Sequence, residues 1–236
     1  MKKFRNNVSR AKWTKTFLIL TMIFTGALMV SNYFQLRLIQ SWIRGEDVYM
    51  LDAEMNDTIQ GLISISTLVC MIALLIFFIS WFRRAYFNLH QKLKHLNHSE
   101  GWAAGAWFVP FLNLYRPYQI AKEIFEESIF YLRTKGIQIS DNKNGLLISW
   151  WILHLITNFL GRILWKMPEE TLEQIEEYTQ FALVSGALNL VFFGFSLYLL
   201  NTYVEREKLM MEAERNESPA SENLDPLPPN PELSLT

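Results

Sequence analysis

The chain has 236 residues, of which half are apolar, and a formal net charge of −1. A charge this close to zero excludes bulk affinity for nucleic acid, and the single cysteine, Cys70, excludes an intramolecular disulfide. Charge is almost absent from four apolar stretches of about 18 to 25 residues, each long enough to cross a bilayer as a helix. We therefore expect an all-α membrane protein with four transmembrane helices, at about residues 16–33, 59–82, 145–165 and 181–203.

The first stretch follows an arm, residues 1–15, with six basic and no acidic side chains. A basic arm before an apolar run is also typical of a cleaved secretory signal, which is the alternative. The run of about 18 residues is longer than the usual signal core. No clean small-x-small cleavage site follows it. We therefore expect an uncleaved first span.

The segments between the spans alternate in charge. Residues 34–58 contain two basic and five acidic side chains, and the loop after the third span contains Lys166 and five glutamates. Basic side chains follow the second span instead. Because basic segments stay in the cytoplasm, we expect an even number of crossings with both termini cytoplasmic. Near the span ends we expect interfacial aromatic side chains, and these are Trp13, Trp42, Trp81, Trp165 and Tyr203.

A fifth apolar stretch, residues 102–115, is too short to cross comfortably, since about 14 residues make a helix of only about 21 Å. Pro110 interrupts its hydrogen bonds. We expect a re-entrant or surface-lying element on the cytoplasmic side, and the sequence leaves those two arrangements open. Pro117 then begins an amphipathic helix to about Arg133, suited to the membrane surface or to docking on the bundle.

Three domains are expected: a basic arm at 1–15, a membrane domain at 16–205 and a cytoplasmic tail at 206–236. The tail begins as a charged continuation of the fourth helix. From Ser218 it is rich in Pro, Ser and Glu, a composition that predicts disorder.

Polar side chains also occur inside the predicted spans. His154, Asn158 and Arg162 share one face of the third span, and Asn189 lies near the middle of the fourth. Such groups usually face the bundle interior. One interpretation is a set of interhelical hydrogen bonds that fix the packing, with Arg162 reaching toward the glutamates of the next loop. The other is a path for a proton or a small solute.

No constellation in the sequence indicates an enzyme, a metal site or a cofactor. Three histidines follow the second span, at 90, 95 and 98, but no cysteine or suitably spaced carboxylate completes a ligand set. We also find no nucleophile with a base and no pair of acidic side chains inside a span. A protein without catalytic activity, cofactor or metal is therefore expected.

Two segments, WFRRAYFNL at 81–89 and GWAAGAWFVPFLNLYRPYQIAKEI at 101–124, resemble a bacterial multi-span membrane family catalogued as domain of unknown function 4328. A Trp pair at 150–151 is also similar, and the resemblance covers roughly residues 15–205. The Glu-rich loop at 169–177 departs from the pattern. The resemblance implies a membrane domain of the bacterial inner membrane with no assigned activity. The motif residues that we take as a candidate interfacial site are Trp81, Arg83, Arg84, Asn88, Gly101, Trp102, Trp107, Pro110, Asn113, Arg116 and Pro117.

These observations support two functional hypotheses. In the first, a non-enzymatic module contacts lipid or a partner, with Arg83, Arg84 and Arg116 holding anionic headgroups and the aromatic rings setting the depth. Its partners would be membrane lipids, an unknown membrane protein or a second copy, and not nucleic acid. In the second, a transporter or channel for a small solute or proton uses His154, Asn158 and Asn189.

Overall fold

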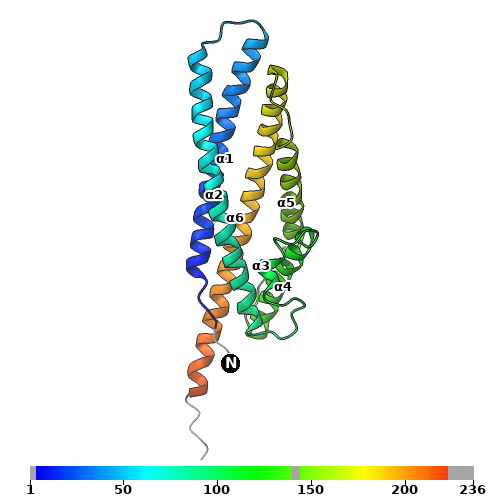
Figure 1. The fold of residues 1–236 in the computed structure, drawn as a ribbon. Helices are drawn as coiled ribbons and strands as arrows, with labels where there is room; N and C mark the ends of the chain where they lie inside the picture. Colours follow the sequence, from blue (N-terminus) through cyan, green and yellow to red (C-terminus); the bar gives the residue numbers. More distant parts are fainter. Residues whose placement is uncertain (1–3, 140–143, 223–236) are drawn as a thin grey trace, which may run out of the picture.

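The computed structural model describes residues 4–139 and 144–222, and the regular structure in these residues is helical. Figure 1 shows the elements as a long bundle with shorter pieces packed at one end. The elements are α1 (Val8–Ile43), α2 (Met50–His90), α3 (Trp102–Gly105), the 3-10 helix η1 (Leu112–Leu114), α4 (Arg116–Thr134), α5 (Asn144–Leu164) and α6 (Leu172–Glu222).

The chain is a multi-pass, all-α membrane protein. Among the described residues, four helices are long and apolar enough to cross a membrane, namely α1, α2, α5 and α6. Each contains or coincides with one of the four predicted stretches. The stretch at 102–115 forms α3, a turn and η1 rather than a spanning helix. The predicted amphipathic helix is α4.

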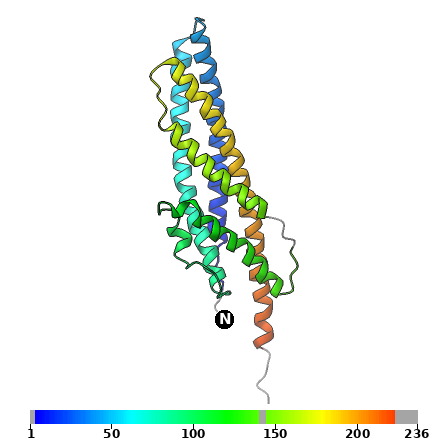
Figure 2. The same ribbon diagram turned by 90° about the vertical axis from the view of Figure 1, so that its right-hand side faces the viewer.

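The four long helices form two hairpins, α1–α2 and α5–α6, whose connections lie at the same end of the bundle (Figure 1). We call this the hairpin end. The opposite end holds the beginning of α1 together with α3, η1 and α4, and we call it the base. Figure 2 shows α4 crossing the base obliquely.

Glycines in the left-handed region end α1 and α4. Gly45 has φ +72° and Gly136 has φ +75°, a conformation that other residues adopt at a cost. After each glycine the next N–H reaches back to a carbonyl five residues earlier, as in Glu46 N to Ser41 O at 3.0 Å. Ile137 N donates to Leu132 O in the same way, also at 3.0 Å. These Schellman turns satisfy the last carbonyls and let the chain reverse.

Most of the large buried side chains gather in the base. Helix α4 lies against α2 and α6, so it docks on the bundle, which is one of the two arrangements its amphipathic pattern allowed. Its apolar face is removed from solvent there, and burial of such a face stabilises the packing. The core includes Trp81, Phe82, Ala85, Tyr86 and Leu89 of α2, Ile120, Ala121, Ile124, Phe125 and Leu132 of α4, and Leu199, Leu200, Tyr203 and Met210 of α6.

The core continues beyond the boundary that we expected at residue 205. Arg206, Glu207 and Met210 are buried, and α6 continues as a helix to Glu222. The first part of the predicted tail therefore packs into the base. The disorder predicted for the proline-rich end concerns residues 223–236, which lie outside the described residues.

Candidate functional site

Four arginines line a cleft at the base, near the point where the apolar stretches of α1 and α2 end. They are Arg5 from the N-terminal arm, Arg10 from α1, and Arg83 and Arg84 from α2. The cleft has a volume of about 560 Å³, and we call it the arginine cleft.

Local contacts hold these side chains in place. Arg83 and Arg84 directly follow Phe82, where the apolar run of α2 ends. Arg10 donates from Nε to Ser80 Oγ at 3.0 Å, which ties α1 to the same turn of α2. The guanidinium carbons of Arg5 and Arg84 lie 4.5 and 5.5 Å from the centre of the Phe87 ring. Both are cation–π contacts, so the two guanidinium groups share one aromatic platform.

The cleft is strongly positive. Among the described residues that line it, the one carboxylate is Glu100, and it pairs with Arg83 at 3.4 Å. Burial lowers the pKa of Arg84, and the positive charges of Arg10 and Arg5 lower it further. Like charges held this close repel one another. An anion in the cleft would relieve that repulsion.

One rim of the cleft is apolar. Leu75, Ile76 and Ile79 of α2 line it together with Phe108. Ile76 is 60% exposed and Phe108 is 67% exposed. The cleft therefore has guanidinium groups beside exposed apolar side chains. The charged groups suit the headgroup of a lipid, and the apolar side chains suit its acyl chain.

The N-terminal arm is held at the cleft by a buried polar network. Asn88 Nδ2 donates to Arg5 O at 2.9 Å, and Arg5 N donates to Asn88 Oδ1 at 3.0 Å, so one side chain pairs with both backbone groups. Glu207 accepts from Asn88 Nδ2 at 2.8 Å and from Asn7 Nδ2 at 3.2 Å. All three polar side chains are buried, which makes the pairing important for stability.

The loop that joins α3 to α4 is clamped between α2 and α5. Trp107 packs edge-on against Phe78 and Phe82, with ring centres 5.3 and 5.8 Å apart. Trp151 Nε1 donates to Leu114 O at 3.0 Å. These contacts hold the loop at the base beside the spans.

The tip of this loop exposes large apolar side chains. Phe111 has φ +64°, and Leu112 N donates across it to Pro110 O at 2.8 Å, which makes a tight γ-turn. A bulky residue in this conformation is strained. The turn leaves Phe111 81% exposed, next to exposed Phe108 and Leu114. The strained turn at Phe111 thus lies at the exposed apolar tip of the loop.

The structure distributes the predicted interfacial motif over different environments. Trp81 and Asn88 are buried in the base rather than lying at an interface, because α6 and the N-terminal arm cover this part of α2. Arg116 stacks 5.0 Å above the Trp102 ring and does not line the arginine cleft. Arg116 therefore does not join Arg83 and Arg84 as expected. Arg5 and Arg10 lie beside them instead. Of the remaining motif residues, Gly101 precedes α3, Pro110 belongs to the turn before η1, Asn113 lies in η1, and Pro117 is buried in the first turn of α4.

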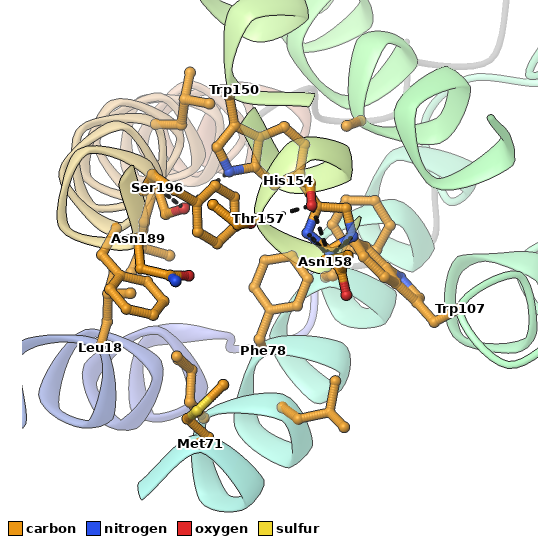
Figure 3. A pocket seen from close by; sticks show the side chains of 18 of the residues that line it. Leu18, Met71, Phe78, Trp107, Trp150, His154, Thr157, Asn158, Asn189 and Ser196 are labelled. Carbon is orange, nitrogen blue, oxygen red and sulfur yellow. Dashed lines mark hydrogen bonds between the residues drawn. The ribbon is translucent and has the colours of Figure 1, made fainter. Parts of the chain in front are cut away.

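A second cavity lies among α1, α2, α5 and α6 at the depth of the spans, although α1 and α6 pack directly against each other. It has a volume of about 640 Å³, and we call it the lateral groove (Figure 3). The predicted polar stripe, His154, Asn158 and Arg162, lines it from α5, and Asn189 lines it from α6. The hydrogen bonds of these side chains stay within single helices. The interhelical hydrogen bonds that the sequence suggested are therefore not formed. Asn158 Nδ2 donates to His154 O at 2.7 Å, and Asn189 Nδ2 donates to Ser185 O at 2.9 Å.

A family model described as Domain of unknown function (DUF4328) matches residues 44–204. The chain belongs to this family. No curated protein and no solved structure matches the chain. The matched range of the DUF4328 domain includes Arg83, Arg84 and the loop before α4, but it begins after α1. Arg5 and Arg10 therefore lie outside the range that the family model describes.

Reasoning from the sequence found two of the four arginines and missed Asn7 and Glu207. Arg5 and Arg10 were recognised as basic residues of the arm, but no local signal places them beside α2. Glu207 is separated from Asn7 by 200 residues. A glutamate in a charged helical extension otherwise predicts a solvated side chain. His90 ends α2, and in the described part of the chain no three His, Cys, Asp or Glu side chains lie together as metal ligands would.

Proposed function

We propose that this DUF4328 protein is a non-enzymatic membrane module that binds an anionic phospholipid of the cytoplasmic leaflet in the arginine cleft. The observation that carries the proposal is the composition of the cleft. Four guanidinium groups and one paired carboxylate line it, beside exposed hydrocarbon of α2 and Phe108.

The charge distribution supports a cytoplasmic base. The N-terminal arm and the arginines after the second span lie at the base, whereas the acidic connections lie at the hairpin end. Because short basic segments remain on the cytoplasmic side, the base and both termini face the cytoplasm in this proposal. The cytoplasmic leaflet is also the one whose anionic lipids attract basic segments next to a span.

The chemistry of the cleft suits a phosphodiester. Guanidinium groups donate paired hydrogen bonds to phosphate oxygens, and such charge-assisted bonds are stronger than neutral ones. With the phosphate near Arg10 and Arg84, an acyl chain would run along Ile76 toward the centre of the bilayer. The exposed tip of the loop, with Phe108 and Phe111, would enter the same leaflet and set the depth.

No observation favours the transport hypothesis over this one. The lateral groove is lined mainly by apolar side chains, and Asn158 and Asn189 each donate a hydrogen bond from Nδ2 to a carbonyl of their own helix. A route for a polar solute needs many groups that replace its hydration, and this lining offers few.

The test compares lipids and matched variants in the purified full-length protein. We expect phosphatidylglycerol to be retained in native mass spectrometry, and to raise the melting temperature, more than phosphatidylcholine does. Each basic residue near an anionic surface contributes about 1 kcal/mol. Combining Arg5→Gln, Arg10→Gln and Arg84→Gln should therefore weaken this preference by roughly 100-fold.

The control removes the same charge elsewhere on the base. Lys12, Lys122 and Lys208 are exposed and do not line the cleft, so their combined change to glutamine should leave the preference intact. Restoring charge with Arg→Lys at the three cleft positions should recover part of the binding. Equal retention of phosphatidylglycerol by the wild type and the cleft variant would overturn the proposal.

A further inference from the structure

The lateral groove has the length and the lining of a site for a hydrocarbon chain. It lies between α1 and α2 on one side and α5 and α6 on the other (Figure 3). Along α5 it extends from Leu147 near the base to Arg162 near the hairpin end. Fifteen residues of helix correspond to about 22 Å, which exceeds the roughly 15 Å that one leaflet contributes to a hydrocarbon core of about 30 Å.

Several polar side chains of the groove have partners within the protein, whereas Trp81 Nε1 and Trp107 Nε1 are buried there without one. Thr157 Oγ1 donates to His154 O at 3.1 Å, and Trp150 Nε1 donates to Ser196 Oγ at 2.8 Å. The amides of Asn158 and Asn189 bond to carbonyls of their own helices, as described above. Because these hydrogen-bonded groups need no water and most of the other lining side chains are apolar, the groove can accept an apolar occupant.

Two cations stand at the hairpin end of the groove. Arg162 and Lys166 line it, and both are exposed. Five glutamates lie within 169–177, yet in the described part of the chain no ion pair joins either cation to a carboxylate. The predicted contact of Arg162 with that loop is thus not formed, and both cations remain open to an external anion.

We propose that the lateral groove holds a phospholipid of the leaflet at the hairpin end. Its phosphate lies between Arg162 and Lys166, and one acyl chain runs along α5 past Gly161 toward Trp150. Basic side chains near a helix end reach for the interface, where lipid phosphates lie. The lipid fills the space that the hairpins leave between them. Leu75 lines both cavities, but the proposal uses none of the charged residues of the arginine cleft and stands independently of it.

Gly161 offers a direct way to block the chain. A Cβ added there meets no atom within 4 Å, so Gly161→Leu fits the fold and projects into the groove. Gly26 on α1 is equally open but does not line the groove, so Gly26→Leu is its matched control. For the headgroup, Arg162→Gln combined with Lys166→Gln is compared with Arg37→Gln combined with Arg44→Gln near the same end.

The measurement is retention of palmitoyl-oleoyl-phosphatidylglycerol by native mass spectrometry. It is made in the background of the triple arginine-cleft variant, so that a lipid in that cleft is not counted. We expect one retained lipid, with about tenfold weaker retention in Gly161→Leu and in the Arg162/Lys166 variant, and no change in either control. Melting curves in detergent report whether each variant is folded.

Unchanged retention in both groove variants would overturn the proposal. It would also fail if the wild type were a dimer without bound lipid and Gly161→Leu made it a monomer, because a second copy would then occupy the groove. If Gly161→Leu does not fold, the headgroup variant and its control still decide the question.

Discussion

The base and the spans of this protein are packed in different ways. In the base, Tyr86, Asn88 and Tyr203 are completely buried, and rings from α2 and α6 meet edge-on, as Trp81 and Tyr203 do at 5.7 Å. In the most apolar part of α2, only 6% of the residues are buried. Burial of apolar surface drives packing in water. In lipid that drive is absent, so α2 and α5 can remain apart and leave a groove, while α1 still packs against α2 and α6.

The largest expected effect is on the free energy of unfolding, when one asparagine is replaced in each of the two regions. Asn88→Ala removes hydrogen bonds to both backbone groups of Arg5 and to Glu207, all inside the base. Since each lost bond to a buried partner costs about 1 kcal/mol or more, we expect the free energy of unfolding to fall by about 3 kcal/mol. Asn158→Ala in the spans should cost less than about 1 kcal/mol, because its side chain is exposed and bonds within α5. Unfolding in mixed detergent micelles measures the free energy of unfolding of both variants. Equal losses in the two variants would contradict the difference in packing between the base and the spans.

An intermediate effect concerns pH and Glu207, which lies four residues beyond the apolar stretch that ends at Tyr203. Burial raises the pKa of this carboxyl above its ordinary value of 4.5, although hydrogen bonds from Asn88 and Asn7 oppose the shift. The folded state therefore binds more protons than the unfolded state above that value. The contribution of Glu207 is greatest at low pH and is lost as the pH rises from about 4.5 through the raised pKa.

Glu207→Gln should remove this part of the pH dependence, because glutamine does not titrate. Melting temperatures between pH 4 and pH 8 would then fall less with rising pH in the variant than in the wild type. Glu205 is exposed on the same helix, so Glu205→Gln should keep the behaviour of the wild type. A Glu207→Gln variant with an unchanged pH profile would show that the buried carboxyl does not couple to folding.

The smallest effect is expected in the exposed turn at the hairpin end. Arg44 Nε lies 2.6 Å from Glu46 Oε1, and this hydrogen bond is the main reason why the pKa of Glu46 is lowered to about 2. Exposed pairs contribute little to stability. Arg44→Gln should leave the melting temperature at pH 7 unchanged while the pKa of Glu46 returns toward 4.5, as followed by carboxyl NMR. A clear drop in the melting temperature would mean that this turn supports the hairpin.

Several features of the fold could be predicted from the sequence because they depend on short segments. A long run of apolar residues makes a spanning helix in almost any context. Length and Pro110 exclude a span at 102–115, and the 3.6-residue periodicity after Pro117 defines α4. The same local reasoning identified Arg83 and Arg84 at the end of the second span and the family motif that contains them.

Only the tertiary structure determines which side chains of distant segments come into contact. It brought Arg5 and Arg10 beside Arg83 and Arg84, and it placed Arg116 on Trp102 instead. Helix α6 and the arm enclose α2 where its span ends, so Trp81 is buried where the local pattern predicted an interface. Apolar content and charge are properties of one segment, whereas burial and the pairing of charges depend on neighbours up to 200 residues away.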